Sequence, residues 1–163
     1  MLKKEPINNL HEQVSSRLMI NTRLIGVAIT IFVLIITLRS EILTENKIIT
    51  YELVLAIPFL LSSSLARSKL GYSSHPMKWN WLGWITYIIG YALLLNVVGI
   101  IVAFYLDVNL SILFFIVNWI LCIVYSLIEI SYKKERLKER LFKDSFFILL
   151  QLFLGLLPAL RVL

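Results

Sequence analysis

The chain has 163 residues, of which 59% are hydrophobic and 16% charged, and its mean hydropathy is +0.84. Soluble domains are about 45–50% apolar and about 25% charged, so this composition excludes an ordinary water-soluble domain. The formal charge of +6 would indicate nucleic-acid binding in a soluble protein, but in a membrane protein basic residues mark the cytoplasmic side. No nucleic-acid partner is therefore expected. A single cysteine, Cys122, excludes a disulfide framework.

Residues 1–23 form the first predicted element, a short cytoplasmic amphipathic helix. Its apolar residues recur at the spacing of one helix face: Ile7, Leu10, Val14 and Leu18. Pro6 precedes this stripe and suits the first turn of a helix. We expect the helix to lie on the membrane surface or against a neighbouring subunit.

Residues 24–163 predict an all-α integral membrane protein, folded as a single transmembrane bundle. Five apolar segments make up this region: Leu24–Leu38, Ile48–Ala66, Trp81–Leu106, Leu110–Ile130 and Phe146–Leu160. A helix needs about 20 residues to cross a hydrocarbon core of about 30 Å. The fifth segment is short and contains Pro158, so five spans are expected, with four spans plus one re-entrant helix as the alternative.

The distribution of basic residues predicts the orientation of the chain. With five spans, thirteen lysine and arginine residues fall on the side of the amino terminus and three on the opposite side. Cytoplasmic loops carry an excess of such residues. The sequence therefore predicts a multi-pass protein of the cell membrane whose amino terminus is cytoplasmic.

Two asparagines lie at matching depths in the third and fourth spans. Asn96 and Asn118 are each 11 residues from Asp107, where we expect the chain to turn. At a rise of about 1.5 Å per residue, both lie about 16 Å below that turn, near the membrane midplane. This midplane polar pair is predicted either to clasp the two helices through a hydrogen bond or to line a pore. The polar face of the fourth span consists, besides Asn118, of Ser111, Cys122, Tyr125 and Glu129.

Small and polar residues at helical spacing predict the interior faces of the other spans. The stripes are Gly26, Thr30, Val33 and Thr37; Glu52, Ala56, Phe59 and Ser63; Ala92, Asn96, Gly99 and Ala103; and Gln151, Gly155 and Pro158. Glu52, near the outer end of its span, is interpreted as an interfacial, solvated carboxylate, with a functional role as the alternative. Glu129 is expected to pair with Lys133, four residues further along a continuing helix.

A basic connector, residues 132–144, joins the fourth and fifth spans on the cytoplasmic side. Its six cations are predicted to bind anionic lipid headgroups or an acidic cytoplasmic protein: Lys133, Lys134, Arg136, Lys138, Arg140 and Lys143. Each cation near an anionic membrane surface contributes about 1 kcal/mol of attraction. Docking of a lipid or protein partner is therefore the predicted role of this segment.

The sequence shows no nucleophile, acid–base pair or metal-binding cluster at a recognisable spacing, so an enzyme, a cofactor and a metal site are not expected. Two functions remain open. One is a small membrane subunit that assembles as a homo-oligomer and, as a scaffold, docks or senses a cytoplasmic partner. The other is an oligomeric ion channel or transport component with a polar midplane lining. The composition, rich in Ile, Leu and Asn, suggests an AT-rich prokaryotic gene and a stress, defence or toxin–immunity system.

Overall fold

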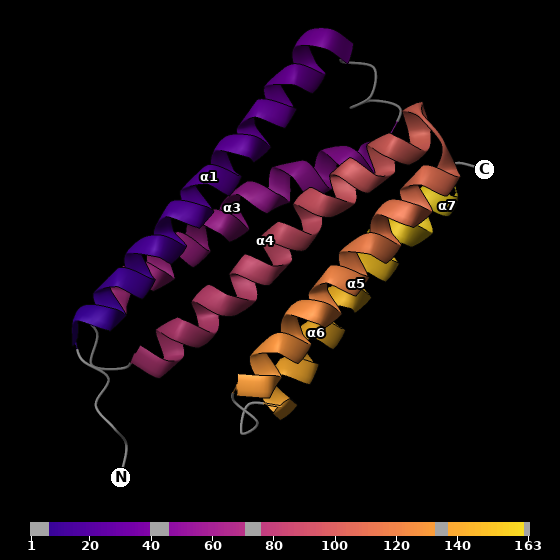
Figure 1. The fold of residues 1–163 in the computed structure, drawn as a ribbon. Helices are drawn as coiled ribbons and strands as arrows, with labels where there is room; N and C mark the ends of the chain where they lie inside the picture. The colour runs from indigo at the N-terminus through magenta and orange to yellow at the C-terminus, as the bar shows by residue number, and fades with distance from the viewer. Residues whose placement is uncertain (1–6, 40–45, 71–75, 133–136, 162–163) are drawn as a thin grey trace. The chain divides into compact units, whose positions relative to one another are not determined.

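The protein is helical throughout the part of the chain that the structure describes. A computed structural model describes residues 7–39, 46–70, 76–132 and 137–161. In chain order the elements are α1 (Ile7–Arg39), α3 (Lys47–Lys69), α4 (Pro76–Tyr105), α5 (Val108–Tyr132), α6 (Leu137–Leu150), the π-helix η2 (Gln151–Leu156) and α7 (Leu157–Leu160), shown in Figure 1. No strand occurs in these ranges.

Five helical stretches are long and apolar enough to cross a membrane. They are Ser15–Thr37, Lys47–Lys69, Pro76–Tyr105, Val108–Ser131 and Leu137–Leu160. The prediction of an all-helical chain with five apolar helices is confirmed at this level. The fifth stretch has 24 residues, because its helix begins within the predicted connector rather than at Phe146. At about 1.5 Å per residue this length exceeds a hydrocarbon core of about 30 Å.

The first helix is longer than the sequence suggested. Instead of an amphipathic helix followed by a separate span, α1 continues without interruption over 33 residues. No proline lies between Ile7 and Arg39 to end the helix. The side chains of Ile7, Leu10 and Val14 lie outside the described part, so their predicted apolar stripe stays a prediction.

The chain divides into two compact units. The first contains α1, α3 from Leu53 onward and α4 up to Tyr91; the second contains the start of α3 through Glu52, α4 from Ala92, and α5 to α7. Helices α3 and α4 thus each contribute residues to both units. Each unit has its own buried polar side chains.

In the first unit, α1 turns a different face inward from the predicted one. The buried residues are Asn21, Ala28 and Ile35, each seven positions from the next, whereas Val33 is 53% exposed. The predicted stripe of Gly26, Thr30, Val33 and Thr37 is wrong. The Thr30 and Thr37 hydroxyls donate to the carbonyls four residues earlier in their own helix, at 2.9 and 2.8 Å. They therefore need no partner in the interior.

Ser63 is the centre of a hydrogen-bond network in the first unit. Its hydroxyl donates to the Gly83 carbonyl at 2.7 Å, and it accepts from Asn21 Nδ2 at 3.0 Å and from Arg67 Nε at 3.3 Å. The Arg67 guanidinium also stacks over the Tyr87 ring, 5.4 Å from its centroid. We call Asn21, Ser63 and Arg67 the Ser63 network. It links α1, α3 and α4, and Asn21 Oδ1 is its one buried side-chain atom without a partner among the described residues.

In the second unit, α4 and α5 are joined by the predicted turn at Asp107. The Asp107 carboxylate accepts the Asn109 backbone N–H at 3.2 Å, which caps the start of α5. Helix α5 then packs along α6, η2 and α7, which lie beside it in Figure 1. The α4–α5 hairpin and the last three helical elements together enclose the polar groups described next.

Candidate functional site

A close approach of α4 and α5 forms one wall of the candidate site. The Ser111 hydroxyl donates to the Gly99 carbonyl at 2.8 Å, and Phe115, one turn further along α5, is fully buried. A Cβ atom at Gly99 would lie within 3.0 Å of the Phe115 ring, so only glycine allows this contact. The two helices are therefore held together by a hydrogen bond and an aromatic ring. Asn96 lies on α4 about one turn before Gly99.

The π-helix η2 brings a second glycine against the same place. A Cβ atom at Gly155 would lie within 3.0 Å of Asn96 Oδ1 and 2.7 Å from the Phe115 ring. The Asn96 carboxamide thus lies directly on the η2 backbone. Gln151 precedes Gly155 by about one turn on the same helix face, and it is also fully buried.

The wide turn of η2 has a local cause in the sequence. Leu157 donates its N–H to the Leu152 carbonyl, five residues earlier, instead of the usual four. Pro158 follows at once; it has no N–H to donate, and its ring crowds the carbonyl four residues before it. Such π segments are rare and occur frequently at functional sites.

Glu52, Asn96 and Gln151 form what we call the inner polar cluster. Their side chains are 4%, 0% and 0% exposed, and all three belong to the second unit. The Glu52 carboxyl lies close enough to the Asn96 carboxamide to interact with it, but the geometry falls short of a hydrogen bond. Asn96 contacts the element that carries Gln151. Glu52 and Asn96 therefore lie side by side, and the buried Gln151 lies on the helix whose Gly155 contacts Asn96.

The inner polar cluster is poorly satisfied. Nine buried side-chain nitrogen and oxygen atoms in the described residues have no hydrogen-bond partner, and six of them are the terminal atoms of Glu52, Asn96 and Gln151. The other three are Asn21 Oδ1, Trp119 Nε1 and Ser126 Oγ. Leaving a buried polar group without a partner costs about 1–3 kcal/mol, and more for a charged group. The number of unpaired atoms in the inner polar cluster distinguishes it from the Ser63 network.

The predicted clasp between Asn96 and Asn118 is not formed. Asn118 Nδ2 donates to the Phe114 carbonyl of its own helix at 2.9 Å, while both terminal atoms of Asn96 lack a partner. Asn96 instead faces Glu52 and Gly155. An equal number of residues from the Asp107 turn did not place the two carboxamides at the same angle around their helices.

Glu52 also differs from its predicted surroundings. The sequence interpretation placed its carboxylate in interfacial water, but the side chain is 4% exposed. Its neighbour in the same unit is Asn96 of α4. Glu52 belongs to one of the predicted interior stripes, and it is buried as that stripe predicts. Gln151 and Gly155, from the stripe of the last helix, are buried too.

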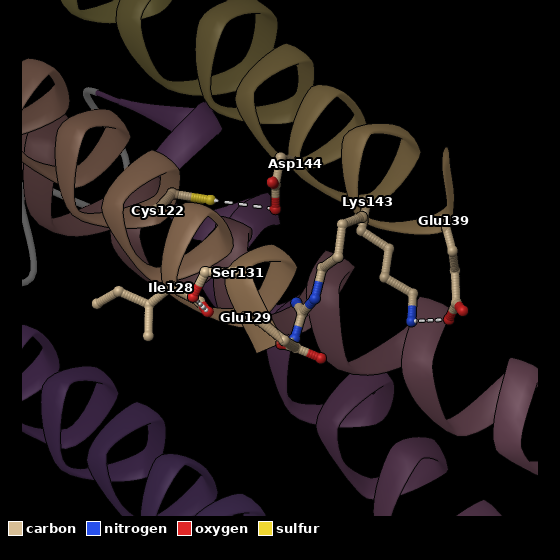
Figure 2. A network of polar contacts seen from close by, with 8 residues as sticks. Cys122, Ile128, Glu129, Ser131, Glu139, Lys143 and Asp144 are labelled. Carbon is tan, nitrogen blue, oxygen red and sulfur yellow. Dashed lines mark hydrogen bonds and ion pairs between the residues drawn. The ribbon is translucent and has the colours of Figure 1, made fainter. Parts of the chain in front are cut away.

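The rest of the predicted polar face on α5 meets α6 instead (Figure 2). The Cys122 thiol donates to an Asp144 carboxylate oxygen at 3.6 Å. Glu129 forms an ion pair with Arg140, and its predicted partner Lys133 lies outside the described residues. Tyr125 lies under the same Arg140 guanidinium, 5.0 Å from its ring centroid. These residues therefore connect two helices.

The predicted docking cations are only partly available. Arg140 pairs with Glu129, and Lys143 pairs with Glu139 on its own helix. Lys138 is exposed. The remaining predicted docking residues lie outside the described residues: Lys133, Lys134 and Arg136. Helix α6 takes up the second half of the predicted connector, which places these charges in the same helix as the fifth apolar stretch.

Within the described ranges, no group of three or more His, Cys, Asp and Glu side chains is arranged to hold a metal ion. The site is instead one carboxyl group with two carboxamides, in an all-helical chain whose five apolar helices suit a membrane. Comparison with protein-family models, curated proteins and solved structures gives no match.

Proposed function

We propose that this chain is a multi-pass protein of the cell membrane that acts as a channel or transport component, with the inner polar cluster in contact with its cargo. The observation that carries this proposal is the burial of Glu52, Asn96 and Gln151 with all their terminal atoms unpaired. Ionisable and polar residues that face the interior of a membrane bundle mark ion and substrate pathways. Apolar side chains of similar shape would fill the same space at less cost.

A homo-oligomer is part of the proposal. Its copies would meet through apolar helix surfaces. Helix α5 supplies apolar surface for such contacts, since Ile120, Leu121 and Leu127 are 54%, 61% and 61% exposed. A second copy or lipid can cover this face. The mass of the protein in mild detergent, measured by native mass spectrometry, should exceed that of one 18.9 kDa chain.

The basic-residue distribution supports a cytoplasmic amino terminus. Labelling of single cysteines tests this orientation in a Cys122→Ala background. An impermeant thiol reagent added outside should label Leu106→Cys, at the α4–α5 turn, and miss Ser131→Cys, near the end of α5. The reverse pattern would overturn the orientation.

A partner-docking subunit is the second candidate function. Met19 and Ile20 on α1 are 54% and 45% exposed, near the exposed Arg17, and this mixed surface suits a lipid or protein partner. The basic connector lends less support than expected, because Arg140 and Lys143 are paired within the chain. The suggested stress, defence or toxin–immunity context stays a prediction.

Swelling of liposomes tests the transport proposal without knowledge of the cargo. Proteoliposomes are diluted into iso-osmotic salts, urea or glycerol, and light scattering reports entry of each solute. At least one solute should enter faster than into protein-free liposomes. Asn96→Leu should abolish this entry, whereas the matched control Asn118→Leu should retain it. No protein-dependent entry of any solute would reject the proposal and favour the docking subunit.

A further inference from the structure

We infer that the inner polar cluster binds a small monovalent inorganic cation, with Glu52 as the charged ligand and the carboxamide oxygens of Asn96 and Gln151 as neutral ligands. This inference rests on the proposed function, whose cargo class it names. It follows from three features of the cluster: its charge, its donor atoms and its size.

The charge of the cluster favours a ligand that carries a single positive charge. Glu52 is its only ionisable side chain, and Glu52 belongs to neither of the ion pairs formed among the described residues. An ionised carboxylate buried without a partner costs several kcal/mol. One monovalent cation neutralises it. A divalent cation would leave a net positive charge in the low-dielectric interior, and an anion would be repelled.

The donor atoms suit a hard cation. Carboxylate and carbonyl oxygens bind alkali and alkaline-earth ions, whereas softer metals prefer sulfur and nitrogen ligands. Glu52 offers two oxygens, and Asn96 and Gln151 offer one each, all without a hydrogen-bond donor. The amide nitrogens of Asn96 and Gln151 are equally free, and Asn96, which lies beside Glu52, can donate to the carboxylate while its amide oxygen faces the ion.

The size of the site favours an inorganic ion over an organic ammonium group. Gly155 has no room for a methyl group, because a Cβ atom there would overlap both Asn96 and the Phe115 ring. Val97 and Ile100, which follow Asn96 on α4, are also fully buried. Protein atoms therefore occupy the space that the carbon substituents of a larger cation would need.

Cation-dependent stability tests this inference separately from transport. The purified full-length protein in detergent is unfolded by heat in NaCl, KCl or choline chloride at equal ionic strength. A ligand that binds only the folded state raises the unfolding midpoint with its concentration. Na⁺ or K⁺ should raise the midpoint over choline. In Glu52→Gln, the half-saturating concentration should increase about ten- to hundredfold, as expected for loss of a charged ligand.

Two further variants keep the test decisive. Glu139→Gln removes an exposed carboxylate from the same unit and should leave the cation response unchanged. Gln151→Leu should weaken the response without changing the charge of the cluster, and it replaces Glu52→Gln if that variant does not fold. A response equal in wild type and Glu52→Gln, or no difference between alkali ions and choline, would overturn the inference.

The two experiments fail independently. Swelling that depends on Asn96 without any alkali-ion effect on stability would leave the proposed function and reject the cation as cargo. Stabilisation that depends on Glu52 without any solute entry would keep the cation site and reject the transport function.

Discussion

The two units of this chain bury similar polar residues but satisfy them differently. In the Ser63 network, the carboxamide of Asn21, the Ser63 hydroxyl and the Arg67 guanidinium meet around one oxygen atom, within 2.7 to 3.3 Å of their partners. In the inner polar cluster, Asn96 and Gln151 keep all their terminal atoms unpaired. The first arrangement is what helix packing needs. The second reduces stability unless something else binds there, and that difference motivates the functional proposal.

The largest expected change in the free energy of unfolding comes from substituting the glycines that contact polar residues in each unit. Gly155→Ala should destabilise the protein by about 1–3 kcal/mol, because overpacked cores cannot accept an added methyl group without strain. Gly83→Ala should cost less, since its Cβ would meet the nearest atoms at 3.3 Å. Equilibrium unfolding in mixed micelles measures both free energies.

Gly26→Ala is the matched control for these glycines. A Cβ atom there has no neighbour within 4 Å, so alanine should stabilise α1 by up to about 1 kcal/mol through its higher helix propensity. Equal losses at all three glycines would contradict the tight packing around the inner polar cluster.

The next effect breaks the Ser63 network. Ser63→Ala leaves Asn21 Nδ2 and Arg67 Nε without their common acceptor, so the free energy of unfolding should fall by about 1–3 kcal/mol. Ser64→Ala, whose hydroxyl bonds only to its own helix at Leu60, should change it by less than about 0.5 kcal/mol. Solute entry should be unchanged in both. Loss of entry in Ser63→Ala would assign this network a role in transport.

Replacing a buried asparagine by leucine should change the free energy of unfolding by a smaller amount, with opposite signs in the two units. Asn21→Leu removes a hydrogen bond to Ser63 and should destabilise the protein by about 1 kcal/mol. Asn96→Leu removes only unpaired atoms, so in buffer with choline as the sole cation it should be neutral or stabilising by up to about 1 kcal/mol. Unfolding titrations of both variants compare the signs directly. Destabilisation of similar size in both would mean that Asn96 has a structural partner.

The smallest expected effect is the coupling between Asn96 and Asn118. A double-mutant cycle with leucine at each position should give a coupling energy below about 0.5 kcal/mol, as for independent sites. A clasp would give about 0.6–1.7 kcal/mol. A coupling energy in that range would support the clasp and contradict the absence of a hydrogen bond between Asn96 and Asn118.

The sequence predicted the apolar helices well because length and hydropathy are properties of each segment alone. It also placed Gln151 and Gly155 on an inward face, since small and polar residues in apolar helices avoid lipid. The same rule failed for α1, where Thr30 and Thr37 satisfy their hydroxyls within the helix. Periodicity cannot distinguish a hydroxyl that needs an interior partner from one bonded to its own backbone.

The composition of the candidate site was harder to predict. Depth along a helix can be counted from the turn at Asp107, but the angle around the helix axis depends on packing against other elements. Asn118 therefore had the expected depth and a different partner. Gly155 allows Asn96 to contact the π-helix that also carries Gln151. Neither effect appears in a count of residues.

The π-turn at Gln151–Leu156 also constrains how the length of the last helix can vary. Each hydrogen bond of a π-turn encloses one residue more than that of an α-helix. Deleting one residue in this segment would permit regular α-helical bonding, because the extra residue of the π-turn would be gone. Gln151 and Ala159, both buried now, would then be seven residues apart and, at about 100° per residue, would stay on the same face. A single-residue deletion should therefore be tolerated better here than elsewhere in the last helix, where it would rotate the following residues by about 100°.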